Sequence, residues 1–363
     1  MFNNPLRGEI ENRSESTLHS YSIGVDLGGT NLRVASYAPE QGFLRTIRIP
    51  TRRTAGRDEV IKDLCEAIES LRSELRGNGL GAGIGIATPG PMELPEGRLL
   101  DPPNLPGWEY FQLRRQLEQR LGDVVVVEND ANAAAFAEWK LGSGKDLAVD
   151  SLCMLTLGTG VGCGVVLRGE IWHGMCGMAG EAGHISVDPD GPMCSCGTRG
   201  CLELFVSATG LVRMGRDLVQ KGAGRRLSEL VKDNPAFTSA DLFSLGIEGD
   251  PDATAIFSMA GKMLGRSLAA LVNVLNLPAY VLGGGAARGW PLFAPFLFEE
   301  LTANSSLYRL SSPAQEPSDR LTRSRTQVVP ARLGADSGLV GACLLPLSPP
   351  EERSPVRAGP VPR

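Results

Sequence analysis

Basic residues, aromatic residues and long apolar runs are all scarce in this sequence. Lys and Arg number 36 against 41 Asp and Glu, a formal net charge of −5, and aromatic residues make up 6% of the 363 positions. The dense basic face that duplex binding requires is therefore missing. The longest purely apolar runs, such as Val124 to Val127, fall far short of the ~20 residues that cross a bilayer. These deficits argue against both nucleic acid and the membrane as partners.

The N-terminus and the cysteines indicate an intracellular protein. Residues 1–20 are polar, mix charges of both signs and contain no apolar core, so they do not have the pattern of a signal peptide. We therefore expect a cytoplasmic location, in which the eight cysteines stay reduced.

Length and composition predict two folded units. With 42% hydrophobic and 21% charged residues the chain is typical of a water-soluble globular protein, and it exceeds the ~250–300 residues at which single cores stop growing. We expect a cleft between the two units. The expected division is a loose leader (1–20), a small N-terminal α/β domain (21–129) completed by residues 330–345, a large α/β domain (130–329) with a cysteine-rich loop, and a tail with six prolines (346–363).

Alternating strands and helices indicate an α/β fold. Apolar periodicity predicts helices at 58–76, 112–120, 133–140 and 253–275, and strands at 21–26, 32–37, 83–87, 124–128, 152–157, 164–167 and 279–282. The Ser- and Pro-rich stretch 309–326 is predicted to be a surface loop. Each half opens with a strand, a glycine-rich turn and a second strand, which suggests a structural duplication.

Three glycine-rich turns follow predicted strands. The first, Asp26 to Thr30, places Gly28 and Gly29 where bare backbone N–H groups can cradle phosphate oxygens, with Asp26 beside them to hold Mg²⁺. The second is Gly158-Thr159-Gly160 and the third is Gly283-Gly284-Gly285. Ordinary explanations compete at each: a hairpin turn, a glycine-kinked strand and a plain strand-to-helix turn. Since neither G-x-x-x-x-G-K-[ST] nor G-x-G-x-x-G occurs, a nucleotide site here is built from separated turns.

Polar residues at Asn104 and at Glu128-Asn129-Asp130 are candidate ligand contacts. Asn104 lies in a Pro- and Gly-rich turn and can orient a small polyol through its donor and acceptor, although asparagine also favours turns for conformational reasons alone. Asp130 follows a valine-rich strand. The carboxyl end of such a strand faces the ligand crevice in α/β proteins, so Asp130 is a candidate general base. The alternative for Asp130 is a helix N-cap.

The most specific pattern joins Gly180-Glu181-Ala182-Gly183-His184 to the cysteines at 194, 196 and 201. One imidazole and three thiolates form a closed tetrahedral set, the usual composition of a structural Zn²⁺ site. Chance buried cysteines are the alternative, and the C-x-C-x₄-C spacing argues against it. We therefore expect a zinc clamp that fixes Glu181, His184 and Glu203 around one pocket. Its ligands are His184, Cys194, Cys196 and Cys201.

Together these motifs resemble the ROK family of bacterial sugar kinases and repressors, within the actin-like ATPase superfamily. The resemblance rests on DLGGT (26–30), ENDANAAAFAE (128–138), LGTGVGCG (157–164), GEAGH (180–184) and CSCGTRGCLE (194–203), which occur in the order of the family. It is strongest to the glucokinase branch. It implies an α/β, two-domain actin-like ATPase (ribonuclease H-like) fold with a structural zinc, and a homo-oligomer, either a dimer or a tetramer.

The resemblance also implies roles for single residues. Asp130 matches the base that takes the proton from the sugar hydroxyl. Sugar-binding positions are matched by Asn104, Asn129, Glu181, His184 and Glu203. The first two glycine turns match the family's phosphate loops, and Gly283 to Gly285 match its adenosine loop. The implied reaction transfers a phosphoryl group from ATP, with Mg²⁺, to the 6-hydroxyl of a hexose, which in the glucokinase branch is glucose.

Three alternatives stay open from the sequence. A different hexose, such as N-acetylmannosamine, N-acetylglucosamine, fructose or allose, would share many of the same hydroxyl contacts. A non-catalytic sugar sensor is the second, although only about twenty residues precede the first predicted strand, which disfavours the added winged-helix domain of repressor members. A zinc-dependent nucleic-acid module is the third, and the charge balance argues against it.

Overall fold

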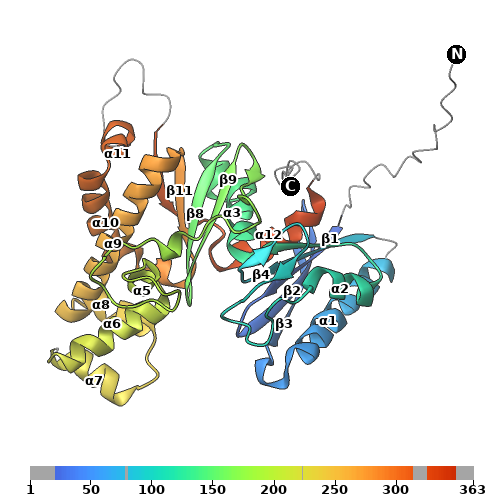
Figure 1. Ribbon diagram of the computed structural model, residues 1–363, viewed down its shortest axis with the longest axis horizontal. Coiled ribbons are helices and arrows are strands. Elements are labelled where there is room, and N and C mark those ends of the chain that lie inside the picture. Colours follow the sequence, from blue (N-terminus) through green and yellow to red (C-terminus); the bar gives the residue numbers. More distant parts are fainter. Residues whose placement is uncertain (1–20, 78–80, 223, 314–324, 349–363) are drawn as a thin grey trace, which may run out of the picture.

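Two five-stranded mixed sheets form the framework of the protein (Figure 1). The computed structural model describes residues 21–77, 81–222, 224–313 and 325–348. The first sheet, in the order β3-β2-β1-β4-β7, contains Tyr21–Leu27 (β1), Asn31–Ala38 (β2), Gly42–Pro50 (β3), Ala82–Thr88 (β4) and Val125–Asn129 (β7). The second, in the order β10-β9-β8-β11-β12, contains Leu152–Leu157 (β8), Val161–Leu167 (β9), Glu170–Ile171 (β10), Ala279–Gly283 (β11) and Gln327–Pro330 (β12).

The two sheets share one topology. In each sheet the first two strands form an antiparallel hairpin, and the first strand also pairs in parallel with the next strand, which pairs in parallel with the last. The outer strands β3 and β10 pair antiparallel with the hairpins. This common order agrees with the duplication that the sequence suggested. It places the glycine turns at 28–30 and 158–160 at equivalent positions, at the tips of the two hairpins.

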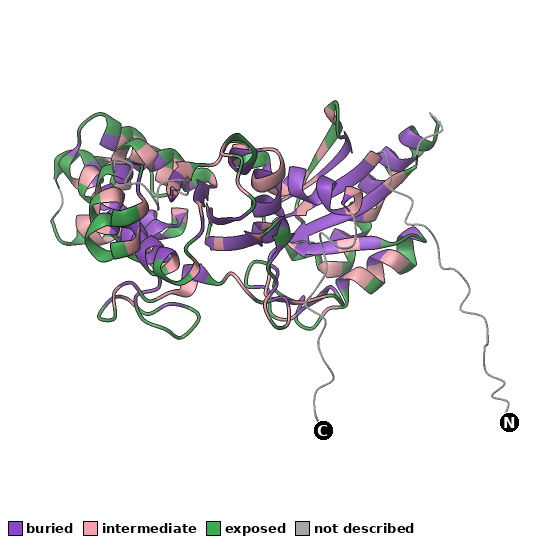
Figure 2. Ribbon diagram, turned by 90° about the horizontal axis from the view of Figure 1, so that it is seen from above, coloured by how far each residue is buried: buried purple, intermediate pink, exposed green. Residues whose placement is uncertain are grey.

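Helices cover the outer faces of both sheets and also lie between them (Figure 2). Arg57–Gly77 (α1) and Leu113–Leu121 (α2) share a buried apolar cluster with the first sheet, and Pro251–Leu275 (α9) and Trp290–Asn304 (α10) share another with the second. Asp130–Lys140 (α3) packs on β8 and β9, and Ser337–Leu344 (α12) packs on β1 and β4. The remaining elements are Met92–Glu93 (β5), Arg98–Leu99 (β6), Ser143–Asp146 (α4), Glu203–Val206 (α5), Ala208–Gln220 (α6), Arg225–Asp233 (α7), Ser239–Ile247 (α8) and Ser306–Ser311 (α11).

The side-chain alternation of β1 explains why the first sheet needs a helix on each face. Ile23, Val25 and Leu27 are fully buried in the cluster that includes α1. Gly24 lies under α12, where a Cβ atom would stand only 2.6 Å from the backbone nitrogen of Cys343. Since successive residues of a strand point to opposite faces, both faces of β1 are covered.

Close contact between α3 and α12 joins the two halves of the molecule. Ala87 of β4, Ala133 of α3 and Ala342 of α12 form a buried cluster of small side chains. A Cβ atom on Gly341 would overlap the carbonyl oxygen of Ala133. The backbones therefore approach to a distance that only small residues permit.

A buried carboxylate strengthens the same joint. Glu138 of α3 is fully buried, and its oxygens accept hydrogen bonds from the backbone N–H groups of Ser143 (2.9 Å) and Leu333 (2.7 Å) and from the hydroxyl of Ser337 (3.0 Å). A buried charge is tolerated when its hydrogen bonds are made within the protein. Glu138 thus ties α3 to the segment that leads into α12.

Helix α3 begins three residues earlier than the sequence pattern predicted, at Asp130 and not at Ala133. The reason is the Asn129 side chain, whose Oδ1 accepts hydrogen bonds from the backbone N–H groups of Ala131 (2.9 Å) and Asn132 (3.2 Å). Asn129 is therefore the N-cap, and Asp130 is the first residue of the helix.

Two other predictions about strands were incomplete. β9 begins at Val161 and not at Gly164, because the hairpin turn occupies only the three residues before it. β3 was not predicted, and none of its residues is buried. An edge strand without a buried face lacks the apolar alternation that marks a strand in a sequence.

The boundaries predicted near the C-terminus also need correction. The stretch 309–326, expected to be a loop, opens inside α11, and residues 314–324 lie outside the described residues. The expected tail from 346 begins within a 3₁₀ turn, Leu345–Leu347, and Ser348 is 2% exposed and donates a hydrogen bond to the Leu344 carbonyl (3.1 Å). Residues 346–348 therefore belong to the described fold. Residues 349–363, like the leader 1–20, lie outside the described residues.

Helix α9 is long and apolar enough to cross a bilayer, the one such helix in the described part of the chain. In its most apolar window 61% of the residues are buried inside the protein. Its buried residues belong to the cluster that α10 and the second sheet complete. A core helix explains this composition.

The joint between α3 and α12 predicts an unusual sensitivity to one methyl group. Gly341→Ala should lower the free energy of unfolding by about 1–3 kcal/mol, because the added Cβ forces the two helices apart. Urea denaturation measures the change. The control is Gly77→Ala at the end of α1, where a Cβ atom would meet nothing within 4 Å. Equal stability of the two variants would contradict the close contact.

Candidate active site

A cavity of about 410 Å³ opens between the hairpin turn of the first sheet and that of the second. Its lining includes most of the residues that the sequence singled out, although they come from distant parts of the chain. They are Gly28, Gly29, Thr30, Asn104, Asn129, Asp130, Gly158, Thr159, Gly160, Glu181, His184 and Glu203. The fold thus brings two glycine turns and a set of polar side chains into one space.

The first glycine turn is fixed to the neighbouring strand and to Asn104. Thr51 donates hydrogen bonds from its hydroxyl to the Gly28 carbonyl (2.7 Å) and from its backbone N–H to the Thr30 carbonyl (2.9 Å). A Cβ atom on Gly29 would lie 2.9 Å from the carbonyl oxygen of Asn104. Glycine therefore lets the turn approach the Asn104 loop.

The second glycine turn is closely tied to Glu203, at the start of α5. The Glu203 carboxylate accepts a hydrogen bond from the Val161 backbone N–H (2.8 Å), and a Cβ atom on Gly160 would overlap the same carboxylate. Burial raises the pKa of the nearby Glu181 carboxyl, and His184 partly offsets this rise in pKa. Acidic side chains therefore dominate this wall of the cavity.

Asp130 lies at the N-terminus of α3, partly exposed to the cavity. Its pKa is raised from 3.8 to about 6, first by burial and then by the nearby negative charge of Asp26, with a smaller contribution from Glu181. A carboxyl group with such a pKa can exchange a proton near neutral pH.

Asp26 and the third glycine turn lie beside the cavity and are absent from its lining. Arg33 donates two hydrogen bonds to Oδ2 of Asp26, from Nη2 (2.6 Å) and Nε (3.0 Å). Gly284 has a φ of +86°, and a Cβ atom there would lie 2.7 Å from the carbonyl carbon of Leu157. Since Leu157 directly precedes Gly158, the third turn adjoins the second.

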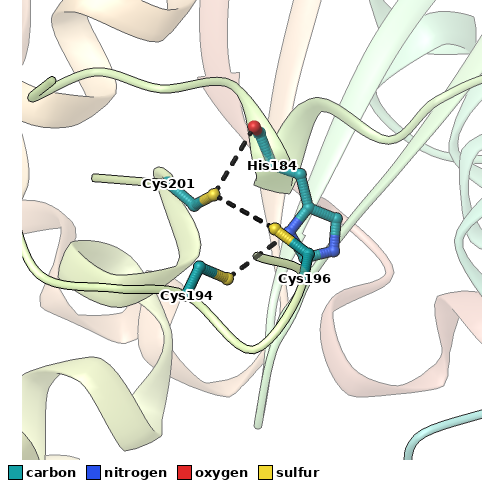
Figure 3. A group of neighbouring side chains, drawn as sticks. All are labelled: His184, Cys194, Cys196 and Cys201. Carbon is teal, nitrogen blue, oxygen red and sulfur yellow. Dashed lines mark hydrogen bonds between the residues drawn. The ribbon is translucent and has the colours of Figure 1, made fainter. Parts of the chain in front are cut away.

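The four predicted metal ligands converge on one point (Figure 3). Their ligand atoms all lie within 4.8 Å of one another. The sulfur atoms of Cys196 and Cys201 are 3.6 Å apart, and that of Cys194 is 3.8 Å from Nδ1 of His184. His184 also lines the cavity. The cluster and the cavity therefore share one imidazole.

Arg53 lines the cavity and was not recognised from the sequence. It is the one Arg or Lys among the described lining residues, and it is exposed at the start of a 3₁₀ turn, Arg53–Ala55. The adjacent Arg52 instead pairs with Asp63 (2.5 Å) and Glu59 (3.3 Å). Nothing in the sequence distinguishes two neighbouring arginines in a polar loop.

His173 and Glu128 form a buried pair that the sequence also did not reveal. Nε2 of His173 lies 2.7 Å from Oε2 of Glu128, and each side chain is 6% exposed. Burial lowers the pKa of His173, but the Glu128 carboxylate raises it by more, so the net change in pKa is upward. The two residues lie 45 positions apart in the chain, and no local pattern links them.

Sequence comparison identifies close relatives along almost the whole chain. The ROK family matches residues 22–348. A glucokinase of Halalkalibacterium halodurans is 32% identical over 321 residues, which cover 88% of this chain and 92% of the relative. An N-acetylmannosamine kinase of Salmonella typhi is 30% identical over 328 residues, which cover 89% of this chain and 97% of the relative.

A solved structure agrees with the sequence matches. A ROK family glucokinase from Streptomyces griseus, in complex with glucose and AMPPNP, superimposes with a TM-score of 0.70 at 30% identity, covering 90% of this chain and 98% of that one. The α/β, actin-like ATPase fold expected from the sequence is thereby confirmed. The chain belongs to the ROK family.

Proposed function

We propose that this protein is an ATP-dependent sugar kinase that transfers the γ-phosphoryl group of ATP to the 6-hydroxyl of glucose. The observation that carries the proposal is one cavity lined by Asp130, by polar side chains suited to sugar hydroxyls and by two glycine turns. The names of the H. halodurans and S. griseus relatives support it. Phosphoryl transfer depends mainly on positioning and charge neutralisation, which such a cavity supplies.

Asp130 is the general base of the proposed reaction. Its raised pKa, about 6, leaves it ionised at neutral pH yet basic enough to accept the proton of the 6-hydroxyl as the sugar oxygen attacks phosphorus. A base in this position contributes about 10²–10⁴ in rate.

The sugar would lie against the polar wall of the cavity. Carboxylates, an imidazole and amides match hydroxyl groups because each hydroxyl both donates and accepts hydrogen bonds. The side chains assigned to this role are Asn104, Asn129, Glu181, His184 and Glu203.

The nucleotide would bind at the glycine turns. Gly28 and Gly158 donate their N–H groups within the turns, to the carbonyls of Asn31 (3.0 Å) and Gly160 (2.9 Å). The backbone N–H groups assigned to phosphate oxygens are therefore those of Gly29, Thr30, Thr159 and Gly160. Arg53 adds a cation to a cavity otherwise rich in carboxylates. Gly283 to Gly285, next to the second turn, are assigned to the adenosine.

Mg²⁺ fits beside Asp26. Both hydrogen bonds from Arg33 go to Oδ2, so Oδ1 remains for the cation or one of its waters. The nearby charge of Asp26 raises the pKa of Asp130, and a pair of neighbouring carboxylates favours a hard cation. When bound, Mg²⁺ supplies charge neutralisation to the phosphates.

A structural Zn²⁺ fits the cluster of His184, Cys194, Cys196 and Cys201. With Zn–S bonds of about 2.3 Å, two sulfurs of a tetrahedron lie about 3.8 Å apart, close to the 3.6 Å between Cys196 and Cys201. Because four protein ligands leave no open position, the zinc is assigned to holding His184 in place and not to the reaction.

The wider organisation is proposed on the same basis. Residues 21–129 with 330–345 form the small domain and 130–329 the large one, a division supported by the return of α12 to the first sheet. Closure of the two domains over sugar and ATP would exclude water, the competing phosphoryl acceptor. A dimer or tetramer and a cytoplasmic location stay predictions.

A second candidate substrate follows from the Salmonella relative. N-acetylmannosamine would use the same reaction, with the acetamido group in place of one hydroxyl. Comparing kcat/KM for glucose and for N-acetylmannosamine at the same ATP concentration separates these two substrates.

Asp130→Asn should lower kcat for glucose by about 10²–10⁴ while glucose still binds, because the amide cannot accept the proton. ADP release with ATP and Mg²⁺ across a panel of hexoses measures this. For the wild-type protein, kcat/KM should also fall as the pH drops through about 6, where Asp130 takes up a proton. Asp58→Asn, an exposed carboxylate on α1, is the control. Retained activity in Asp130→Asn would remove Asp130 from its role, and silence of the wild type on every sugar would refute the kinase.

The same substitution should stabilise the fold. Since folding raises the pKa of Asp130 from 3.8 to about 6, the ionised carboxylate costs about 1–3 kcal/mol above pH 6 and nothing below about pH 4. Asp130→Asn should therefore melt above wild type at pH 7.5, and the difference should vanish in acid. A lower Tm at pH 7.5 would contradict this account.

Arg53→Gln should raise the KM for ATP by roughly tenfold or lower kcat to a similar extent, because a charged hydrogen bond to phosphate is worth about 1.5–3 kcal/mol. The KM for glucose should stay within about twofold. The matched control is Arg52→Gln, whose guanidinium is turned to Asp63 and Glu59. Identical kinetics for the two variants would exclude a phosphate contact by Arg53.

Cys196→Ser should reduce the bound zinc and lower the Tm, since a structural metal site stabilises the folded state. Elemental analysis and thermal unfolding are the measurements, and chelation of the wild-type protein should give the same direction. Cys176→Ser, outside the cluster, should change neither quantity. Zinc-free wild-type protein with an unchanged Tm would refute the site.

A further inference from the structure

The buried pair of His173 and Glu128 lies beside the cavity and makes no contribution to its lining. Nε2 of His173 bonds Oε2 of Glu128, and Nδ1 has no hydrogen-bond partner among the described residues. The bond to Glu128 is therefore the polar contact that orients the ring. Burying such a pair costs desolvation free energy, and the pair connects two parts of the site.

On one side the pair reaches the start of α3. Oε1 of Glu128 accepts hydrogen bonds from the backbone N–H of Asn129 (2.8 Å) and from the side-chain amide of Asn132 (2.9 Å). Asn129 in turn caps the helix whose first residue is Asp130. Because the cap fixes the backbone of the first turn, the position of Glu128 sets the position of Asp130.

On the other side the pair reaches the segment 172–181, which carries Glu181. The His173 carbonyl accepts a hydrogen bond from the Ala179 N–H (3.2 Å), and the Trp172 N–H donates to the Val165 carbonyl of β9 (2.8 Å). The segment is thus anchored to the second sheet by its backbone and to α3 by the His173 side chain.

From this geometry we infer that His173 is a positioning residue, which holds the segment 172–181 against the first turn of α3 and so sets the placement of Asp130 relative to Glu181. The inference rests on the proposed function, in which Asp130 is the base and Glu181 binds the sugar. Displacement of a reacting group by about 1 Å can cost about 10²-fold in rate. Because His173 bonds Glu128 and does not line the cavity, it acts through Glu128 and does not touch the substrate.

A pair of amide substitutions tests the inference. In His173→Gln the side-chain amide nitrogen reaches close to the place of Nε2 and can still donate to Glu128, whereas in His173→Asn the shorter side chain cannot. We expect His173→Gln to keep kcat for sugar phosphorylation within about threefold of wild type. We expect His173→Asn to lose about tenfold to a hundredfold in kcat, with a smaller change in the KM for ATP.

Stability is controlled separately. Arg72→Met removes another buried ion-pairing residue, on α1, and should lower the Tm without changing kcat. Equal kcat in His173→Asn and His173→Gln, or a kcat for His173→Asn as high as that of Arg72→Met, would overturn the positioning role.

Failure of the proposed function gives a different result. In that case wild type itself turns over no sugar, and hydrogen exchange of the amides at 129–132 replaces kcat as the readout. Faster exchange there in His173→Asn than in His173→Gln is the expected outcome. The same protection in both variants would overturn the link between His173 and α3.

Discussion

The close contact between α3 and α12 is the constraint on which the rest of the structure depends. Helix α3 packs mainly on the second sheet and α12 on the first, and the two helices meet through Ala133, Gly341 and Ala342. Because these side chains are small, the two helices approach closely, and the two hairpin turns face each other across a cavity of about 410 Å³. The buried Glu138 then fixes the joint with hydrogen bonds that an apolar contact alone would not provide. Asp130 lies at the opposite end of the same helix, so the proposed base is positioned by the element that joins the halves.

Acidic side chains outnumber basic ones in and around the cavity. Asp130, Glu181 and Glu203 line it, Asp26 lies nearby, and Arg53 is the one Arg or Lys among the described lining residues. Burial and mutual repulsion raise the pKa of Asp130 and of Glu181 as a result. A site that keeps carboxylates close together gives up stability for reactivity, a common balance in catalytic sites. The Val161 N–H restrains the Glu203 carboxylate from within the cavity lining, whereas the restraint inferred for Asp130 acts from outside it, through Glu128 and His173.

The sequence was most informative where chemistry is local. Glycine turns after strands, and a histidine followed by a cysteine trio, are short patterns. The structure brings the first two glycine turns to one cavity, with the third beside it, and the histidine and cysteines to one cluster. The N-cap was assigned less well, because Asn129 and Asp130 are adjacent and either residue type suits the position. Long-range pairs such as His173 with Glu128 leave no trace in a single sequence. The proline content at 346 also concealed that Ser348 packs into the fold. The catalytic and binding roles of the site residues, and the domain boundaries, stay predictions.

The return of the C-terminus to the first sheet has a consequence for biosynthesis. In Figure 1 the red helix α12 lies beside the blue strands of the N-terminal sheet, and Cys343 closes over Gly24. That face of β1 and β4 has no covering helix until residue 344 has left the ribosome. At about 5–20 residues per second, the face waits roughly 15–60 s after β1 has been made. During this interval the backbone of a sheet face lined by small residues, among them Gly24 and Gly85, is open to other chains. The protein is therefore expected to depend more on holding chaperones as its translation slows.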